Sequence, residues 1–148
     1  MTTQLILYDA PDDHAPFLPF SISRPLGELR YGAFLLRERW SARLDLPVSG
    51  YLSPHEHLLD FVEPGAPAVV ARPGEKHEPR LLFRSTFVPA AGLDPQAPRA
   101  EAVRFVDSAG TTVGFSLPRR ADWPGFDTAA RWPAVRLEGK RLAGAWEL

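Results

Sequence analysis

Prolines divide this chain into short stretches, because sixteen of them are spread along its 148 residues. They do not gather into a proline-rich linker, so we expect them to mark loops between short helices and strands. A chain of this length is typical of one domain, and residues 1–148 are predicted to form a single unit. Such a unit hides roughly two thirds of its unfolded surface, which is enough for a real core.

Short apolar runs indicate where the strands lie. Four runs that end at turn residues are predicted strands, at residues 4–8, 48–52, 68–72 and 80–89. Residues 101–118 give the clearest local pattern, because two alternating apolar stretches flank the sequence Asp-Ser-Ala-Gly. This pattern predicts a β-hairpin with a four-residue loop.

Two helices are predicted between these strands. After Pro25, apolar residues recur at three- and four-residue steps and would form one helix face: Leu29, Ala33, Leu36, Trp40 and Leu44. Gly32 lies within that stretch and weakens a helix by about 1 kcal/mol relative to alanine, so the helix could begin later than Pro25. Ser53 and Pro54 fit a helix N-cap and first position, which predicts a second helix to about Val62. Together these elements predict an α/β fold, a small mixed sheet with flanking helices and a C-terminal β-hairpin.

Composition excludes several classes of protein and partner. The net charge of −1 gives no strongly basic surface for nucleic acid or an anionic membrane. The chain has no cysteine, which excludes disulfides, thiolate metal sites and a thiol nucleophile. Its first residues lack a signal-peptide pattern, and no stretch approaches the ~18 apolar residues of a membrane span. We therefore expect a cytoplasmic protein that has neither nucleic acid nor a membrane as its partner.

Asp9 is the first candidate for a functional role. It follows the first predicted strand, and ligands of open α/β sheets bind at the carboxyl ends of strands. Asp12 and Asp13 follow closely, and the three carboxylates could hold Mg²⁺ beside a phosphate. Alternatively, these residues serve only as turn formers, a role that aspartate often has.

Arg24, Arg30 and Arg37 are candidates for binding a phosphate. The planar guanidinium group suits phosphate, and an anion is favoured near a helix N-terminus. Arg30 and Arg37 are seven residues apart and would share a face of the predicted helix. The alternative is a solvated basic surface in which Glu28 and Glu38 are the partners.

The histidines and aromatic residues offer weaker signals. His55 and His57 would point about 200° apart on the predicted helix, and a zinc site needs three or four converging ligands. His77 is expected to be solvated. Five aromatic residues could stack on a base or sugar, although such residues more often form a core or an interface: Trp40, Trp123, Trp132, Trp146 and Phe126. Glycine-rich phosphate loops and the common hydrolase motifs are absent from the sequence.

Residues 5–40 carry a series of motifs that follow a strand ending in acidic residues. The motifs are Leu18-Pro19-Phe20-Ser21, Ser23-Arg24-Pro25, Glu28-Leu29-Arg30, Gly32, and Arg37-Glu38-Arg39-Trp40. This stretch resembles the opening of the sugar nucleotidyltransferases related to the bifunctional N-acetylglucosamine-1-phosphate uridylyltransferase/glucosamine-1-phosphate acetyltransferase. A looser likeness runs from residue 80 to residue 118.

The resemblance implies a reduced nucleotidyltransferase-like, Rossmann-like domain that corresponds to the N-terminal domain of that family. In the family a left-handed β-helix acyltransferase domain follows, and its hexapeptide repeats do not occur in residues 1–148. The implied reaction is attack of a sugar 1-phosphate on a nucleoside triphosphate with Mg²⁺, which depends on positioning and charge neutralisation. In this interpretation Arg24 is the catalytic residue, Arg24, Arg30, Arg37 and Ser21 bind the substrate phosphates, and Asp9 binds the metal.

A non-catalytic role is the alternative prediction. The domain would then pack on a partner such as the β-helix acyltransferase domain, or on a second copy of itself as a homo-oligomer. Arg24 would bond to backbone carbonyls or to Glu28 as a structural anchor, and exposed Trp or Leu side chains would favour this view. A metal-dependent hydrolase is a third possibility and depends on the histidines alone.

Overall fold

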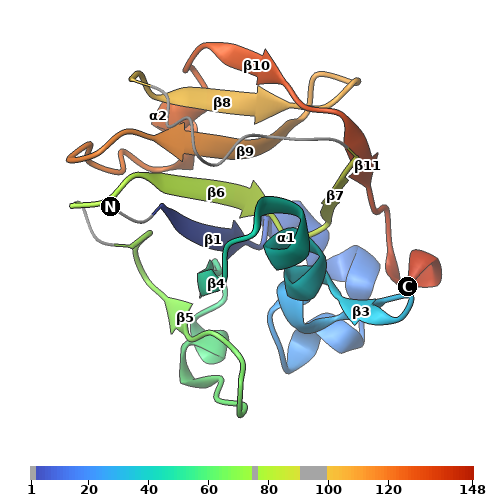
Figure 1. Ribbon diagram of the computed structural model, residues 1–148. Helices are drawn as coiled ribbons and strands as arrows, with labels where there is room; N and C mark the ends of the chain where they lie inside the picture. The colour runs from blue at the N-terminus through green and yellow to red at the C-terminus, as the bar shows by residue number, and fades with distance from the viewer. Residues whose placement is uncertain (1–2, 75–76, 91–99) are drawn as a thin grey trace.

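A single mixed sheet forms the centre of the computed structural model, which describes residues 3–74, 77–90 and 100–148. Within these residues the sheet has the order β10-β8-β9-β6-β1-β4-β5 (Figure 1). Its parallel part consists of β1 (Gln4–Tyr8), β4 (Val48–Leu52), β5 (Val69–Val70) and β6 (Arg80–Arg84). The rest consists of β8 (Val103–Val106), β9 (Thr112–Leu117) and β10 (Ala134–Arg136). Strand β9 runs antiparallel to both β6 and β8, whereas β10 runs parallel to β8.

The predicted strands occur where the apolar runs placed them, with two changes in length. Strands β1 and β4 match the predicted boundaries, and the run at 68–72 forms only the two-residue strand β5. The run at 80–89 divides into β6 and β7 (Phe87–Pro89) at Ser85 and Thr86. Strand β7 leaves the central sheet and pairs with β11 (Gly139–Arg141) in a separate ribbon.

The predicted hairpin is present as β8 and β9. Its loop is held by Asp107, whose Oδ1 accepts hydrogen bonds from the backbone N–H groups of Ala109 and Thr111, both at 2.9 Å. A short carboxylate that binds the backbone two residues further on is the usual way in which aspartate stabilises a turn. Local chemistry is therefore sufficient to form this connection.

The first predicted helix begins much later than the apolar stripe suggested. Residues before it form a small antiparallel ribbon of β2 (Arg30–Tyr31) and β3 (Phe34–Leu35), with Gly32 at a φ of 67° in the turn. Helix α1 spans only Leu36–Leu44. Glu38 fixes its start, because its Oε2 accepts a hydrogen bond from the Leu35 N–H at 2.7 Å.

The second predicted helix is a 3-10 turn. Ser53 is not its N-cap: the Ser53 Oγ accepts the His55 N–H at 3.2 Å, and η5 begins afterwards and spans Glu56–Asp60. The remaining short helical elements are η1 (Pro11–Asp13), η2 (Ala15–Phe17), η3 (Phe20–Ile22), η4 (Leu26–Glu28), α2 (Phe126–Ala129) and η6 (Ala145–Glu147). Among the residues that the structure describes, every helical element other than α1 has at most five residues.

Alternating residues of each central strand pack into two apolar layers, one on each face of the sheet. On one face, Leu5 and Leu7 of β1 pack with Trp40 of α1, whose ring stacks on Phe83 at a centroid distance of 4.2 Å. On the other face, Ile6 and Tyr8 of β1 belong to the cluster beneath α2: Ile6, Tyr8, Ala10, Leu52, Leu82, Phe115, Leu117 and Ala129. Figure 1 shows α1 in front of the sheet and α2 behind β8 and β9.

A third apolar cluster lies at the carboxyl edge of the parallel strands. It joins the long segment after β1 to the start of α1 and to the last part of the chain through Phe17, Leu26, Leu29, Leu36 and Leu142. The architecture is mixed α/β with a mostly parallel central sheet and few helices, as predicted. Among the described helices, none has the length and apolar character that crossing a membrane requires.

Candidate functional site

The carboxyl ends of β1 and β6 meet at the point where the connections of the sheet change direction. From β1 the chain leads through α1 to β4, which lies on one side of β1, whereas β6 lies on the other side. The residues between β1 and β2, which include the short turns η1 to η4, are called the N-terminal segment below. Figure 1 shows both strands pointing toward the edge of the sheet where this segment lies. In open α/β sheets this switch point is where ligands bind.

Asp9 occupies this switch point and is only 4% exposed. Its Oδ1 accepts a hydrogen bond from the Ser85 Oγ at 2.9 Å, and its Oδ2 accepts one from the Leu26 N–H at 3.1 Å. Burial raises the pKa of Asp9 to about 7, an effect that these two hydrogen bonds reduce and the nearby charge of Asp13 increases. Asp9 thus connects β1, the turn after β6 and the start of η4.

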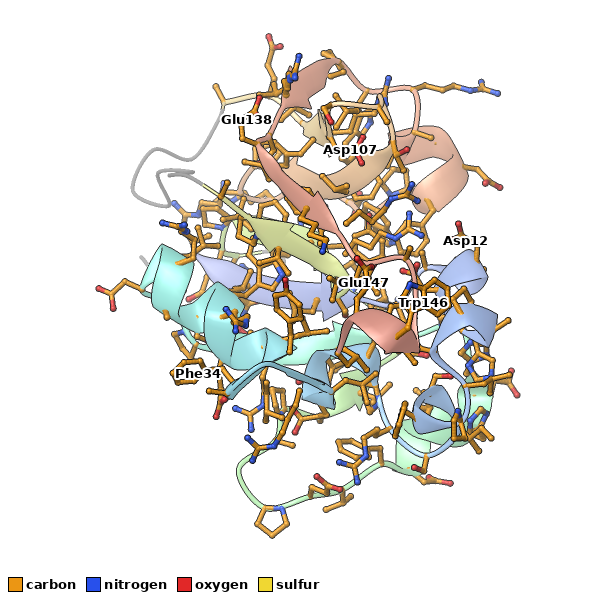
Figure 2. The ribbon with its side chains drawn as sticks, turned by 90° about the vertical axis from the view of Figure 1, so that its right-hand side faces the viewer. Asp12, Phe34, Asp107, Glu138, Trp146 and Glu147 are labelled. Atoms are coloured by element: carbon orange, nitrogen blue, oxygen red, sulfur yellow. The ribbon has the colours of Figure 1, made fainter. Side chains whose placement is uncertain are left out.

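A second polar cluster fills the rest of the switch point. Arg84 donates from Nε and Nη2 to the two carboxylate oxygens of Asp13, both at 2.7 Å, and from Nη2 to Asp12 at 3.0 Å. The Thr86 hydroxyl also donates to Asp13, at 3.1 Å. Burial alone would lower the pKa of Arg84, but the bonds and charge of Asp13 raise it above its ordinary value. Asp12 is the exposed member of this cluster, and Figure 2 shows it on the short helical turn η1 after β1.

The switch point is therefore filled by side chains of the chain itself.

A cavity of about 730 Å³ lies next to the same N-terminal segment, and we call it the loop cavity. Its polar lining consists of Ser23, Arg24, Glu28 and Arg30, and its other lining residues are Pro19, Phe20, Leu29, Leu35, Ala145 and Leu148. The mixture of apolar surface with a few charged groups is typical of small-molecule sites.

The two arginines of the loop cavity have different partners. Arg24 forms an ion pair with Glu63 at 3.1 Å, and both side chains are about 40% exposed. Arg30 is exposed and donates to the Ala33 carbonyl at 3.2 Å. Exposed contacts of this kind contribute little to stability, so both guanidinium groups can be recruited by a ligand at small cost.

Glu28 forms a buried part of the cavity wall. Its Oε2 accepts hydrogen bonds from the Arg37 Nε at 2.5 Å and from the Tyr51 hydroxyl at 2.6 Å. Burial, followed by the bond to Glu28, raises the pKa of Tyr51, which keeps its hydroxyl protonated as a donor. The charge of Glu28 is thus balanced by Arg37 and that of Arg24 by Glu63, so the net positive charge of the wall comes from Arg30.

The structure brings together only part of the set predicted from the sequence. Arg24 and Arg30 line the same cavity, but Arg37 does not line it. Arg30 lies in β2 and not in α1, so the prediction that Arg30 and Arg37 share a helix face is wrong. Ser21 is 2% exposed and donates to the His14 carbonyl at 2.8 Å, which fixes the N-terminal segment. The ligand-binding roles of these residues stay predictions.

The histidines gather more closely than their spacing suggested. The rings of His14 and His55 lie 4.3 Å apart, and those of His55 and His57 lie 5.8 Å apart. Within the described ranges of the chain, no group of three or more His, Asp or Glu side chains could hold a metal ion. His77 is exposed, as predicted.

The aromatic candidates divide between core and surface. Trp40 is buried, and Trp123 and Trp132 pack edge-on against Phe115. Trp146 is 77% exposed on η6, and Figure 2 shows it with Glu147 on the same side of the molecule as Asp12. Phe126 is 38% exposed. The core interpretation holds for the first three tryptophans.

Sequence reasoning did not find several residues that shape this region. Glu63 binds Arg24, which lies far from it along the chain, and Ser85 and Thr86 were included in a predicted strand. Glu28 was named as an arginine partner in the alternative prediction, and it binds Arg37. The polar sequence Arg-Ser-Thr between two apolar runs at 84–86 was the available signal that the strand is interrupted there.

The mostly parallel central sheet and the few helices packed on it define a small protein of the mixed α/β class. Residues 5–116 match the family model described as sugar nucleotidyl transferase. The match covers most of the chain, and the chain belongs to this family. A comparison with curated proteins finds no match.

Proposed function

We propose that the chain binds a nucleotide or sugar phosphate in the loop cavity and transfers a nucleotidyl group from a nucleoside triphosphate to a sugar 1-phosphate. The observation that carries this proposal is the placement of Arg24 and Arg30 on the wall of one cavity. Membership of the sugar nucleotidyl transferase family supports the type of ligand. A closer relation to the N-terminal domain of the bifunctional uridylyltransferase/acetyltransferase is part of the same proposal.

The reaction requires positioning and neutralisation of charge. A phosphate oxygen of the sugar 1-phosphate attacks the α-phosphorus of the triphosphate, a new P–O bond forms, and the bond to the pyrophosphate leaving group breaks. Arg24 and Arg30 would neutralise the phosphate oxygens as their charge is redistributed, with Arg24 as the catalytic residue. Phe20 and Leu29 would provide apolar surface for the base or sugar.

Arg37 and Ser21 would contribute to binding through the cavity walls. Arg37 balances the charge of Glu28, and an unbalanced carboxylate there would repel a phosphate. Ser21 fixes the segment that leads to Arg24 through its bond to the His14 carbonyl. Arg37 and Ser21, which the sequence predicted to contact phosphate, would thus shape the site without lining the cavity.

Magnesium is expected for this reaction because it neutralises phosphate charge. Asp9 does not suit this role as it stands, because both of its carboxylate oxygens accept hydrogen bonds from the chain. Asp9 would have to lose one of these bonds to coordinate an ion. The requirement for Mg²⁺ stays a prediction, and no step of the proposed reaction is assigned to it.

Thermal unfolding with nucleoside triphosphates, nucleotide sugars and sugar 1-phosphates, each with and without Mg²⁺, tests the proposal. A ligand at a hundredfold excess over its Kd stabilises the protein by about 2.7 kcal/mol. Arg24→Ala and Arg30→Ala should each weaken binding about tenfold or more, since a hydrogen bond to a charged group is lost. Pyrophosphate release then distinguishes transfer from binding alone.

Two further variants sharpen this test. Glu63→Gln removes the carboxylate that competes for Arg24, so affinity should rise by up to about fivefold. Arg136→Ala is the matched control, because Arg136 is also exposed and also ion-paired, with Glu138, but lies on β10. Equal affinity in Arg24→Ala, Arg30→Ala and the control would refute the proposed site.

A non-catalytic interaction domain is the second candidate function. Three apolar side chains of the N-terminal segment are between 45% and 54% exposed: Leu18, Phe20 and Ile22. Exposed apolar groups that lie so close in the chain favour a contact surface. Sedimentation of the parent and of Ile22→Ser would detect self-association, and loss of association in the variant without any ligand binding by the parent would favour this role.

A further inference from the structure

Arg80 is a buried cation at the amino end of the parallel strands, opposite to the switch point. It is the first residue of β6 and is only 2% exposed, so its guanidinium group is removed from water. Figure 1 shows the start of β6 beside the N-terminus, whereas the N-terminal segment lies at the other edge of the sheet. Burial of a charge costs a large free energy unless the charge is paired and its donors are bonded.

The hydrogen-bond partners of Arg80 are few for a buried guanidinium group. Its Nη1 donates to the Pro73 carbonyl at 3.2 Å, and its Nη2 donates to the Ala121 carbonyl. Its Nε is buried and has no hydrogen-bond partner. A guanidinium group carries five N–H donors, so two bonds to neutral carbonyls use only part of what Arg80 can donate.

Arg84 shows how the same strand balances a buried arginine. The two residues lie four apart on β6 and therefore point to the same face of the sheet. Arg84 forms an ion pair with Asp13, whereas no ion pair within the part of the chain that the structure describes includes Arg80. The charge of Asp122 raises the pKa of Arg80, but burial has the larger effect and lowers this pKa below its ordinary value.

A cavity of about 440 Å³ lies against Arg80, and we call it the Arg80 cavity. Its charged lining residues are Arg72, Arg80 and Asp122, so two cations face one anion. Trp123 and Pro73 are among its apolar lining residues. A cavity of this volume with apolar walls and a few charged groups is typical of small-molecule sites.

Trp123 gives the Arg80 cavity a fixed aromatic wall. Its ring packs edge-on against Phe115 and Trp132, at centroid distances of 5.4 Å and 6.1 Å. These contacts hold the indole in place, so a ligand that packs on it need not immobilise it. An indole offers a large apolar face to a flat molecule and one N–H donor to a polar group.

We propose that the Arg80 cavity binds a small organic anion, whose phosphate or carboxylate group meets Arg80 and Arg72 and whose planar body lies against Trp123. The planar guanidinium fork suits both kinds of oxyanion. Binding would bring a counter-charge to a buried cation that now bonds to neutral carbonyls. The Arg80 cavity and the loop cavity have no lining residue in common, so this proposal does not depend on the proposed function.

Heteronuclear NMR of the parent protein tests the site, with phenyl phosphate, benzoate and inorganic phosphate as separate probes. The indole N–H signal of Trp123 should shift with phenyl phosphate or benzoate, and the affinities of these two show which oxyanion the site prefers. Inorganic phosphate should bind more weakly than phenyl phosphate, because it has no ring to bury against the indole. The signal of Trp40, which is buried beneath α1, should stay in place with all three probes.

The same spectra separate the two cavities. Ala145 and Leu148 line the loop cavity, so their amide signals report on a ligand that binds there. Shifts at Ala145 and Leu148 without a shift at Trp123 would overturn the proposed second site and leave the proposed function intact. An unchanged Trp123 signal with all three probes at millimolar concentration would overturn the proposal as well.

Arg72→Ala provides the decisive variant, because Arg72 is exposed and its loss leaves the buried contacts in place. Binding of phenyl phosphate, followed through the Trp123 signal, should weaken about tenfold. Arg119→Ala is the matched control: Arg119 is also exposed and also follows the amino edge of β6, where it donates to the His77 carbonyl, but it does not line the cavity. Equal weakening in both variants would show only general attraction to surface charge and would overturn the proposal.

Arg80→Lys tests the buried cation itself. Lysine keeps the positive charge but loses the planar group that bonds to both carbonyls, so binding should weaken at least as much as in Arg72→Ala. Circular dichroism establishes that the variant is folded, and unchanged binding in a folded Arg80→Lys protein would contradict the proposal. The comparison of Arg72→Ala with Arg119→Ala uses exposed positions alone, so it decides the question if Arg80→Lys does not fold.

Discussion

At the scale of single residues, Asp9 shows how burial changes the chemistry that a sequence suggests. The sequence offered an acidic residue at a strand end, whereas the structure gives a carboxyl that is 4% exposed and has a pKa of about 7. Between its ordinary value of 3.8 and about 7, the folded protein keeps a proton that the unfolded chain releases. Stability therefore falls as the pH rises through this range, and the loss is complete above pH 7.

Asp9→Asn should remove this loss. The amide can accept the Leu26 N–H through its oxygen and donate to the Ser85 Oγ, which still donates to the Tyr8 carbonyl. The difference in free energy of unfolding between variant and parent should grow with pH by up to about 1.4 kcal/mol per unit between pH 4 and pH 7. Urea unfolding at several pH values measures it.

Asp127→Asn controls for the removal of one negative charge, because Asp127 is exposed on α2. A difference between Asp9→Asn and its parent that stays constant with pH would contradict the raised pKa of Asp9.

At the scale of secondary structure, the ribbon of β2 and β3 decides where α1 can begin. Gly32 has a φ of 67°, a conformation that costs residues with a Cβ roughly 1–2 kcal/mol. A Cβ at this position would also lie 3.0 Å from the Nη2 of Arg39, which donates to the Tyr31 carbonyl. The turn therefore requires glycine, and the helix starts after it.

Gly32→Ala distinguishes the two interpretations of this stretch by the sign of its effect. In a helix, the substitution would stabilise the protein by about 1 kcal/mol. In the observed turn, it should destabilise the protein by roughly 1 kcal/mol or more. Denaturant unfolding measures the change, and Ala42→Gly, an exposed position within α1, should cost about 1 kcal/mol as a reference. A more stable Gly32→Ala protein would rule out the turn.

At the scale of the whole molecule, one buried ion pair joins the N-terminal segment to the sheet. Arg84 of β6 is 6% exposed and binds both oxygens of Asp13 across the switch point. Removing one partner of a buried pair leaves an uncompensated charge, so Arg84→Met should destabilise the protein by roughly 3–5 kcal/mol. Thermal and denaturant unfolding would measure this loss.

A second substitution identifies the cause of that loss. Adding Asp13→Asn to Arg84→Met removes the orphaned charge and keeps an acceptor for the Thr86 hydroxyl, so part of the stability should return. Arg136→Met, at an exposed ion pair on β10, should change stability by less than about 1 kcal/mol. If the double variant were less stable than Arg84→Met, the uncompensated charge would not be the cause.

The sequence by itself determined those features that depend on neighbouring residues. Short apolar runs located β1 and β4. Alternation of apolar residues located β8 and β9, because the two faces of a strand repeat every second residue. The loop held by Asp107 depends on atoms within four residues of it. The motif around Arg24 and Pro25 indicated the family before any contact was known.

Only the tertiary structure decided which side chains meet. Glu28 binds Tyr51, Asp13 binds Arg84, and the ring of His14 lies against that of His55, each pair well separated along the chain. Packing then set which charges pair inside the molecule, such as Asp13 with Arg84, and which side chains line a cavity, such as Arg24 and Arg30. These outcomes follow from how the long segment after β1 packs on the edge of the sheet, and no local pattern of residues encodes that packing.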